Sequence, residues 1–154
     1  MGEQQTPTKI INVRGSNGSG KTTVMKKLIE LSQDRYHVRH PETHKPYATV
    51  LYDLQYVLVG VYPDDKAHGG CDTIKSMDEI KDILLELVEA YSGYWILLEG
   101  MLISTTTTVY RYMLELQQSH GIVPFIVVLK STPEGCLKRI EKRRGSPLDR
   151  TDLV

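Results

Sequence analysis

The stretch Lys9–Thr23 reads KIINVRGSNGSGKTT, and the rest of the fold can be worked out from it in both directions. Residues Gly15–Thr22 fit the spacing G-x-x-x-x-G-K-[ST] at every fixed position. The apolar residues just before this loop predict a buried strand over Lys9–Arg14. The pattern after the loop predicts a helix over Gly20–Gln33. The inward face of that helix is expected to carry Val24, Leu28, Ile29 and Leu31.

The loop between this strand and this helix is suited to hold a polyphosphate. Its three glycines, Gly15, Gly18 and Gly20, permit backbone angles that a Cβ would resist, so the N–H groups can turn inward around an anion. The positive end of the helix dipole points at the same place. A plain glycine-rich turn is the alternative, but the flanking strand and helix agree with the phosphate interpretation.

The side chains at the end of the loop indicate what they would bind. Lys21 is expected to reach the β- and γ-phosphates of a nucleotide, and the Thr22 hydroxyl is expected to ligate Mg²⁺. The predicted nucleotide-binding residues are Gly15, Ser16, Asn17, Gly18, Ser19, Gly20, Lys21, Thr22 and Thr23.

Length and composition describe an ordinary globular protein. The 154 residues suggest a single domain over 1–154, with 40% hydrophobic and 25% charged residues. No apolar run approaches the roughly 20 residues that span a bilayer, and the polar start Met1–Thr8 lacks a signal-peptide core. The two cysteines imply no disulfide framework, so a reducing, cytoplasmic setting is expected.

The net charge is zero, but the charges are unevenly distributed. Residues 1–50 carry 8 basic and 4 acidic side chains, residues 51–100 carry 3 and 10, and residues 101–154 carry 8 and 5. The basic ends contain the glycine loop and a later arginine-rich helix. This distribution suits a local anion pocket better than a protein-wide field for nucleic acid, although a local patch would suffice for DNA.

Strands and helices alternate along the rest of the chain, which predicts an α/β fold with a parallel sheet. Further strands are expected at about Tyr36–His40, Thr49–Tyr52, Tyr56–Tyr62, Tyr94–Gly100 and Ile122–Lys130, and further helices after Ser76 and over Thr106–His120 and Glu134–Arg144. Ser76 and Glu79 form a capping-box pattern at the start of the first of these helices. Whether Thr49–Tyr52 and Tyr56–Tyr62 form a hairpin or extend the main sheet stays open.

Two carboxylates are candidates for the chemistry. Glu99 ends an apolar strand at the edge where such sheets bind ligands, so it could hold a Mg²⁺-bound water or orient a hydroxyl; a surface carboxylate is the alternative. Asp72 could receive the proton of an acceptor hydroxyl, or it could cap a helical turn at Thr73. Asp53 is a weaker competitor because turns favour aspartate anyway.

The helix over Glu134–Arg144 is rich in basic residues, which suggests a lid that neutralises charge during phosphoryl transfer. A solvated helix face is the alternative. The arginines chosen for this role are Arg139 and Arg143, with Arg144 and Arg150 beside them. Arg14 could neutralise a neighbouring carboxylate, and Arg39 could meet a substrate phosphate.

The tyrosines and one cysteine leave alternatives open. Tyr47, Tyr52, Tyr56 and Tyr62 could stack on a base, although most strand tyrosines serve in packing. Cys71, beside two glycines, could be reactive or could be a small buried thiol.

The glycine loop, the strand that ends in Glu99-Gly100 and the arginine-rich helix together resemble the P-loop nucleoside and nucleotide kinases. The stretch Gly69–Lys75 and the small size resemble, within that group, phage thymidylate-kinase-like enzymes that phosphorylate 5-hydroxymethyluracil in DNA. The resemblance covers most of the chain, but only the glycine loop is a specific motif.

This resemblance implies a three-layer P-loop kinase fold with a mainly parallel central sheet, and transfer of the ATP γ-phosphoryl group with Mg²⁺. Lys21, Asp72, Glu99, Arg139 and Arg143 are then the expected catalytic residues, and Thr22 and Glu99 the expected metal ligands. The implied acceptor is the hydroxymethyl group of 5-hydroxymethyluracil in phage DNA, in the host cytoplasm. A small-molecule nucleoside or nucleoside monophosphate kinase is the alternative.

The sequence departs from the P-loop kinase pattern in two places. The group usually has another strand and helix after the lid, whereas this sequence stops at Val154, so its C-terminal part is expected to be either truncated or missing from this sequence. A thymidylate kinase would show an Asp-Arg pair where Glu99-Gly100 stands, which argues against dTMP as the acceptor. A GTP-binding switch is disfavoured because the chain has no N-K-x-D run, and a scaffold without turnover is the remaining alternative.

Overall fold

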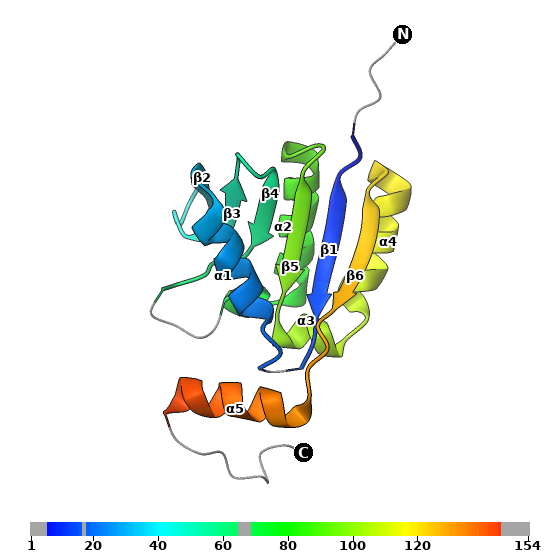
Figure 1. Cartoon of the computed structure of the whole chain (residues 1–154). Helices are drawn as coiled ribbons and strands as arrows, with labels where there is room; N and C mark the ends of the chain where they lie inside the picture. Colours follow the sequence, from blue (N-terminus) through cyan, green and yellow to red (C-terminus); the bar gives the residue numbers. More distant parts are fainter. Residues whose placement is uncertain (1–5, 17, 65–68, 146–154) are drawn as a thin grey trace.

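The computed structural model describes residues 6–16, 18–64 and 69–145, with the side chains of residues 143 and 144 outside this description. Six strands form one sheet in the order β2-β3-β4-β5-β1-β6 (Figure 1). The strands are β1 (Lys9–Arg14), β2 (Arg35–Arg39), β3 (Pro46–Leu51), β4 (Tyr56–Val59), β5 (Trp95–Glu99) and β6 (Val123–Val128). The helices are α1 (Lys21–Leu31), α2 (Met77–Ala90), α3 (Met101–Thr105), α4 (Thr108–His120) and α5 (Pro133–Arg144), with a short 3-10 helix η1 (Cys71–Thr73). The prediction of an α/β fold is confirmed.

The sheet is mixed, which corrects the prediction of a mainly parallel one. β4, β5, β1 and β6 run parallel, whereas β3 is antiparallel to both of its neighbours, β2 and β4. Short connections join β2 to β3 and β3 to β4, and short connections can only join antiparallel neighbours. The open question about the predicted strands Thr49–Tyr52 and Tyr56–Tyr62 is also answered. They correspond to β3 and β4, which form a hairpin and both extend the main sheet.

Each face of the sheet has its own apolar core, because successive strand residues point to opposite faces. On one face Ile10, Ile96 and Leu98 pack with α2 and α4. On the other face Leu58 and Leu97 pack with α1. Figure 1 shows this arrangement, with α1 in front of the sheet and α2 and α4 behind it.

Helix α1 turns two of the predicted residues inward, Leu28 and Ile29, together with Met25, which was not predicted. Met25 is fully buried, whereas Val24 and Leu31 are 42% and 59% exposed. Leu28 and Ile29 follow Met25 by three and four residues, so the three side chains share the inward face. In α2 and α4 the buried apolar residues recur at helical spacing, and they are Ile80, Ile83, Leu84, Leu87, Val88, Val109, Met113 and Leu116.

Two helix starts show how local sequence sets the boundaries. At the start of α2 the Ser76 hydroxyl accepts a hydrogen bond from the Glu79 N–H at 3.2 Å, as the capping-box pattern predicts. The short helix α3 was not predicted. It follows Gly100 directly, and the threonine run after it separates α3 from α4 instead of opening one longer helix.

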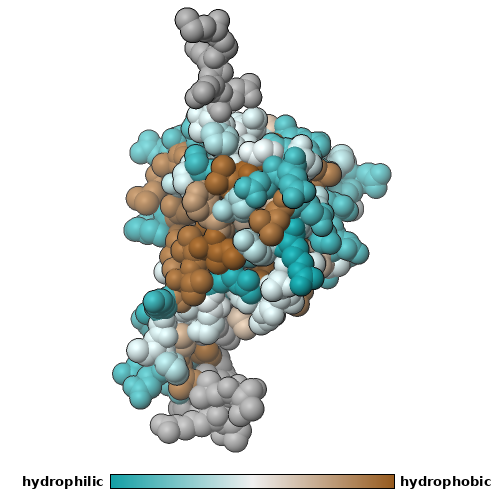
Figure 2. All heavy atoms as spheres, turned by 90° about the vertical axis from the view of Figure 1, so that its right-hand side faces the viewer, coloured by the Kyte–Doolittle hydropathy of each residue, from teal (hydrophilic) through white to brown (hydrophobic). Residues whose placement is uncertain are grey.

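Strand β6 lies at the edge of the sheet and is only partly covered. Phe125, Ile126, Val127 and Val128 are between 41% and 59% exposed. The Phe125 ring stacks on Trp95 with 5.9 Å between centroids, and Lys9 lies over the Trp95 ring. Figure 2 faces this side of the molecule and shows an apolar patch there. Within the described ranges no helix has the length and apolar character needed to cross a membrane.

Candidate functional site

The carboxyl ends of the parallel strands meet at one edge of the sheet, where ligands bind in open α/β sheets. The glycine loop follows β1 at this edge and leads into α1, and α5 lies across the same edge (Figure 1). Gly18 and Gly20 have φ angles of +80° and +101°, which L side chains rarely adopt. The loop backbone therefore depends on glycine at these two positions.

Lys21 lies inside this loop. The residue is only 6% exposed, and its Nζ donates hydrogen bonds to the carbonyls of Gly15 at 2.8 Å and Ser16 at 3.0 Å. The Ser19 hydroxyl is also buried and has no hydrogen-bond partner among the described residues. A buried ammonium and a buried unpaired hydroxyl in a glycine loop form a suitable environment for an anion.

Glu99 connects the loop to two other elements of the edge. It ends β5 with 1% exposure, and its Oε1 accepts hydrogen bonds from the Thr22 hydroxyl at 3.3 Å and the Tyr62 hydroxyl at 3.0 Å. Thr22 comes from the first turn of α1, and Tyr62 follows β4. Three segments that are far apart in the sequence thus meet at one carboxylate.

Burial raises the pKa of the Glu99 carboxyl above its ordinary value, and the nearby Asp72 charge raises it further. The hydrogen bonds from Tyr62 and Thr22 and the charge of Lys21 act in the opposite direction but do not cancel the effect of burial. Burial also raises the pKa of Tyr62, with Glu99 adding to the shift.

Asp72 lies beside this carboxylate on the segment that forms η1. An added Cβ at Gly70 would lie 2.6 Å from Glu99 Oε1, so the backbone packs directly against Glu99. The Asp72 carboxylate accepts the Met101 N–H at 2.9 Å and 3.2 Å and so caps α3, not the predicted turn at Thr73. Because the Asp72 side chain is exposed, it can cap α3 and still contact a bound substrate.

Helix α5 reaches the glycine loop through two residues. The Arg139 guanidinium donates to the Gly18 carbonyl and to the Ser131 hydroxyl, both at 3.0 Å. An added Cβ at Gly18 would lie 2.5 Å from the Cys136 carbonyl oxygen, so loop and helix are in close contact. The structure therefore brings one predicted lid arginine to the loop.

Cys136 is a buried thiol whose Sγ lies 3.3 Å from the Ser16 hydroxyl. Burial alone would raise the pKa of Cys136, but hydrogen bonds from Ser16 and Ser131 and the charges of Arg139 and Lys21 lower it. The loop and α5 thus share an electropositive environment.

Several predicted residues lie elsewhere or outside the description. Asn17, Arg150 and the side chains of Arg143 and Arg144 are outside the described part of the chain. Arg14 donates to the carbonyls of Ser104 and Thr106 and not to a carboxylate. Arg39 donates to the His44 carbonyl, and Asp53 accepts from Ser32 and Gln33 in a turn. Burial raises the pKa of Cys71, which favours the buried-thiol alternative.

The sequence did not single out some residues of this site. Tyr62 was one of four tyrosines with an undecided role. Its position just beyond the end of a strand, at the edge where ligands bind, was the one feature that could have indicated a place in the site. Ser131, Cys136 and Gly70 gave no signal of their own, because their places depend on how α5 and η1 pack against the edge.

The residues at this edge fit a magnesium ion. Mg²⁺ prefers oxygen ligands and is usually held by one or two protein oxygens together with substrate phosphates. The Thr22 hydroxyl and the Glu99 carboxylate are such ligands and lie 3.3 Å apart. In the described part of the chain, no three His, Cys, Asp or Glu side chains gather into a further metal site.

Comparisons with known proteins agree with an enzyme that works on phosphate groups. The family model described as 5-hmdU DNA kinase matches residues 1–154. The chain therefore belongs to the 5-hmdU DNA kinase family, and the protein is an enzyme, a kinase. No solved structure matches the chain at a significant level.

Curated relatives support the same assignment. A 5-hmdU DNA kinase of Pseudomonas phage PaMx11 is 33% identical over 139 residues, which cover 88% of this chain and 69% of the relative. A 5-hmdU DNA kinase of Pseudomonas phage M6 is 32% identical over 151 residues, covering 95% and 78% of the two chains. A third, from Bacillus phage SP10, is 31% identical over 143 residues, covering 91% of this chain but only 22% of the relative.

Proposed function

We propose that this kinase transfers the γ-phosphoryl group of ATP to the hydroxymethyl group of 5-hydroxymethyluracil in DNA. The observation that carries the proposal is the meeting of the glycine loop, Lys21 and the Thr22–Glu99 pair at one edge of the sheet. The phosphate-binding spacing supports ATP as donor and a P-loop kinase fold. The names of the relatives support the acceptor.

The donor end of the site consists of the loop and α1. Loop N–H groups and Lys21 bind the β- and γ-phosphates, which requires Lys21 to exchange its bonds with the carbonyls of Gly15 and Ser16 for bonds with phosphate oxygens. Thr22 and Glu99 would hold Mg²⁺, which would neutralise charge on the phosphates. Arg139 stabilises the negative charge that develops on the transferring group.

The acceptor end of the site consists of the carboxylates. The acceptor oxygen attacks the γ-phosphorus in line, the bond from that phosphorus to the bridging oxygen breaks, and ADP leaves with the electron pair. The proton of the acceptor hydroxyl passes to the exposed Asp72 carboxylate, while Glu99 stays on the metal side. A base inside a duplex has to leave the stack to reach this edge.

The proposal is tested with γ-labelled ATP and a panel of acceptors: free nucleosides, nucleoside monophosphates, ordinary DNA and 5-hydroxymethyluracil DNA. We expect label only on the modified DNA, and we expect Lys21→Ala to abolish transfer. Lys27→Ala, an exposed lysine of the same helix, is the matched control and should retain activity. Label on the free monophosphates alone would contradict the DNA acceptor and favour the small-molecule alternative. Lys21→Ala with full activity would contradict the donor site.

A further inference from the structure

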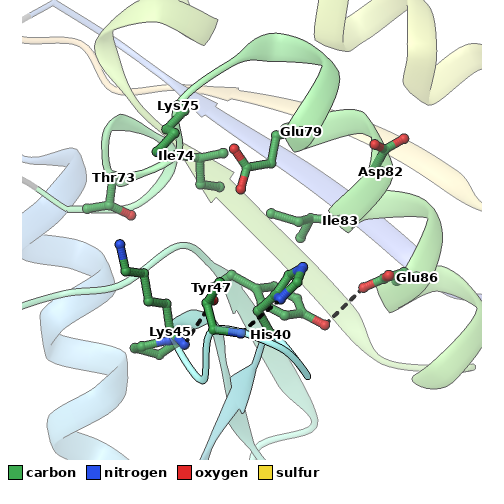
Figure 3. Close-up of a pocket in the computed structure, with 12 residues that line it drawn as sticks. His40, Lys45, Tyr47, Thr73, Ile74, Lys75, Glu79, Asp82, Ile83 and Glu86 are labelled. Carbon is green, nitrogen blue, oxygen red and sulfur yellow. Dashed lines mark hydrogen bonds between the residues drawn. The ribbon is translucent and has the colours of Figure 1, made fainter.

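A pocket lies between the turn that joins β2 to β3 and the first half of α2. Its volume is about 560 Å³, within the range of small-molecule sites of roughly 300–1,000 Å³. His40 and Lys45 line it from the turn, Tyr47 from β3, and Glu79 and Glu86 from α2 (Figure 3). None of these residues belongs to the donor site described above.

The mixed sheet places this pocket at the same edge as the glycine loop. β4 is parallel to β5, and β3 is antiparallel to β4, so β3 begins at the edge where β4 and β5 end. The pairing of Ala48 with Val59 fixes this register. The β2–β3 turn therefore lies at the ligand-binding edge, on the sheet face that α2 covers.

One backbone segment connects the pocket to the carboxylates. Gly70 packs against Glu99, and Asp72 caps α3 beside Gly100. The next residues, Thr73, Ile74 and Lys75, line the pocket. Thr73 also donates to the Gly70 carbonyl at 2.7 Å, which holds the segment in a tight turn. Because Thr73 follows Asp72 directly, the pocket begins next to the proposed proton acceptor.

The walls of the pocket differ in charge. His40, Lys45 and Lys75 supply basic side chains, whereas Glu79, Asp82 and Glu86 make the α2 side acidic. In Figure 3 the Lys45 side chain extends toward Thr73, and the Glu79 carboxylate lies on the opposite wall. Tyr47 lies between the walls, and its hydroxyl donates to Glu86 at 2.9 Å. Ile74 and Ile83 add apolar surface.

These walls match an extruded pyrimidine nucleotide. An aromatic ring can stack on the base, and lysines can bind the flanking phosphates, which must stay away from the acidic side. The imide N–H of a uracil ring needs an acceptor, which a carboxylate on α2 supplies. A cytosine ring presents an unprotonated nitrogen at the same position, so a carboxylate there would disfavour it.

We propose that this pocket receives the acceptor nucleotide of the DNA, with Tyr47 beside the base and Lys45 and Lys75 on the flanking phosphates. The inference rests on the proposed function, because it assigns the acceptor side of the same reaction. It makes Tyr47, Lys45 and Lys75 binding residues with no direct part in the donor chemistry.

The test measures binding of a fluorescent single-stranded oligonucleotide that carries one 5-hydroxymethyluracil, together with the KM for that DNA and for ATP. Lys45→Ala and Lys75→Ala should each weaken binding and lower the slope of log affinity against log salt by about 0.7. Tyr47→Ala should weaken binding on the order of 10- to 100-fold. Tyr47→Phe, which keeps the ring, should bind nearly as well as the wild type. The KM for ATP should stay within about twofold in all four variants.

Two variants serve as matched controls. Tyr36→Ala removes an exposed tyrosine from the other end of β2, and Lys27→Ala removes an exposed lysine from α1. Both should leave DNA binding unchanged. Thermal melting identifies a variant that fails to fold. If Tyr47→Ala fails to fold, Tyr47→Phe and the two lysine variants still test the proposal.

The failures of the two proposals can be told apart. If the wild type phosphorylates the modified DNA but the Lys45, Lys75 and Tyr47 variants bind it normally, the pocket assignment is wrong and the function stands. If the variants lose DNA affinity while the wild type transfers no phosphate to it, the pocket is supported and the proposed reaction fails. Equal affinity for 5-hydroxymethylcytosine and 5-hydroxymethyluracil DNA would overturn the assigned role of the acidic wall.

Discussion

At the scale of single residues, Tyr47 shows how a contact changes a proton equilibrium. Burial and the hydrogen bond to Glu86 raise the pKa of Tyr47 from 10.0 to about 12. The folded protein therefore holds this phenol proton more tightly than the unfolded chain does. The resulting contribution to stability is complete below pH 10.0 and is lost as the pH rises through about 12.

Glu86→Gln is expected to lower the pKa of Tyr47, because it removes the negative charge while burial remains. The pKa should fall from about 12 but stay above 10.0. Absorbance titration near 295 nm, with Tyr47→Phe subtracted to isolate the one tyrosine, measures the change. An unchanged titration would show that Glu86 does not influence the phenol.

Glu99 is expected to be essential for activity and dispensable for folding. A glutamine at this position can still accept from the hydroxyls of Tyr62 and Thr22 but loses the charge that a metal ion needs. Glu99→Gln should lower kcat on the order of a hundredfold or more without lowering the melting temperature. Glu115→Gln, at an exposed carboxylate of α4, is the control. Normal turnover by Glu99→Gln would remove Glu99 from the mechanism.

Single residues could be predicted where a local motif fixes their chemistry. Lys21 and Thr22 follow from the loop spacing, and Glu99 follows from its place at a strand end. Tyr62 could not be separated from other strand tyrosines, because its partner is 37 positions away. The cap from Asp72 to Met101 was missed for the same reason, since it joins residues 29 positions apart.

At the scale of elements, α5 holds the glycine loop in place. Its contacts with the loop are the Arg139 bond to Gly18 and the close approach at Cys136. Arg139→Ala should lower kcat on the order of 10²–10³-fold, because it removes the guanidinium that lies at the loop and is proposed to stabilise the transferring group. Lys138→Ala, the neighbouring exposed residue, should change kcat less than about twofold. Steady-state kinetics of the two variants distinguish a lid arginine from a solvated one.

Elements with strong periodicity were predicted well. α2 carries five buried residues at helical spacing and a working cap, so its position in the sequence was clear. α1 was located correctly, and Leu28 and Ile29 face inward as predicted, but Met25 is buried whereas Val24 and Leu31 are exposed. Met25 and Val24 are both apolar, so only packing chooses between them. α3 is too short to show a period, and β3 begins at Pro46, inside a stretch whose composition predicts a loop.

At the scale of the whole molecule, the sheet edge at β6 exposes four consecutive apolar side chains, and Figure 2 shows an apolar patch on this side. Val128→Lys should raise solubility, because Val128 is 59% exposed and the new charge would interrupt the patch. The free energy of unfolding should change by less than about 0.5 kcal/mol. Gln118→Lys adds the same charge on the polar surface of α4 and controls for net charge. Precipitation by ammonium sulfate, with chemical denaturation alongside, measures both effects.

The α/β class follows from the alternation of strands and helices, but the direction of β3 does not. Antiparallel pairing depends on the lengths of the loops before and after β3. The sequence did not define either end of this strand, which was expected at Thr49–Tyr52 and lies at Pro46–Leu51. The glycine loop of the proposed donor site could be located from the sequence, because one continuous stretch contains it together with the start of α1. The acceptor pocket could not, because its lining comes from three separate segments of the chain.

The antiparallel pair of β2 and β3, Arg35–Leu51, has a consequence for how such an enzyme could diversify. The proposed phosphate-binding loop lies between β1 and α1 in the first third of the domain, whereas one side of the proposed acceptor pocket is lined by residues of the segment Arg35–Leu51. These two blocks do not overlap in the gene. We therefore expect a chimaera that exchanges only Arg35–Leu51 to change which nucleobase is modified and to keep the same phosphoryl donor.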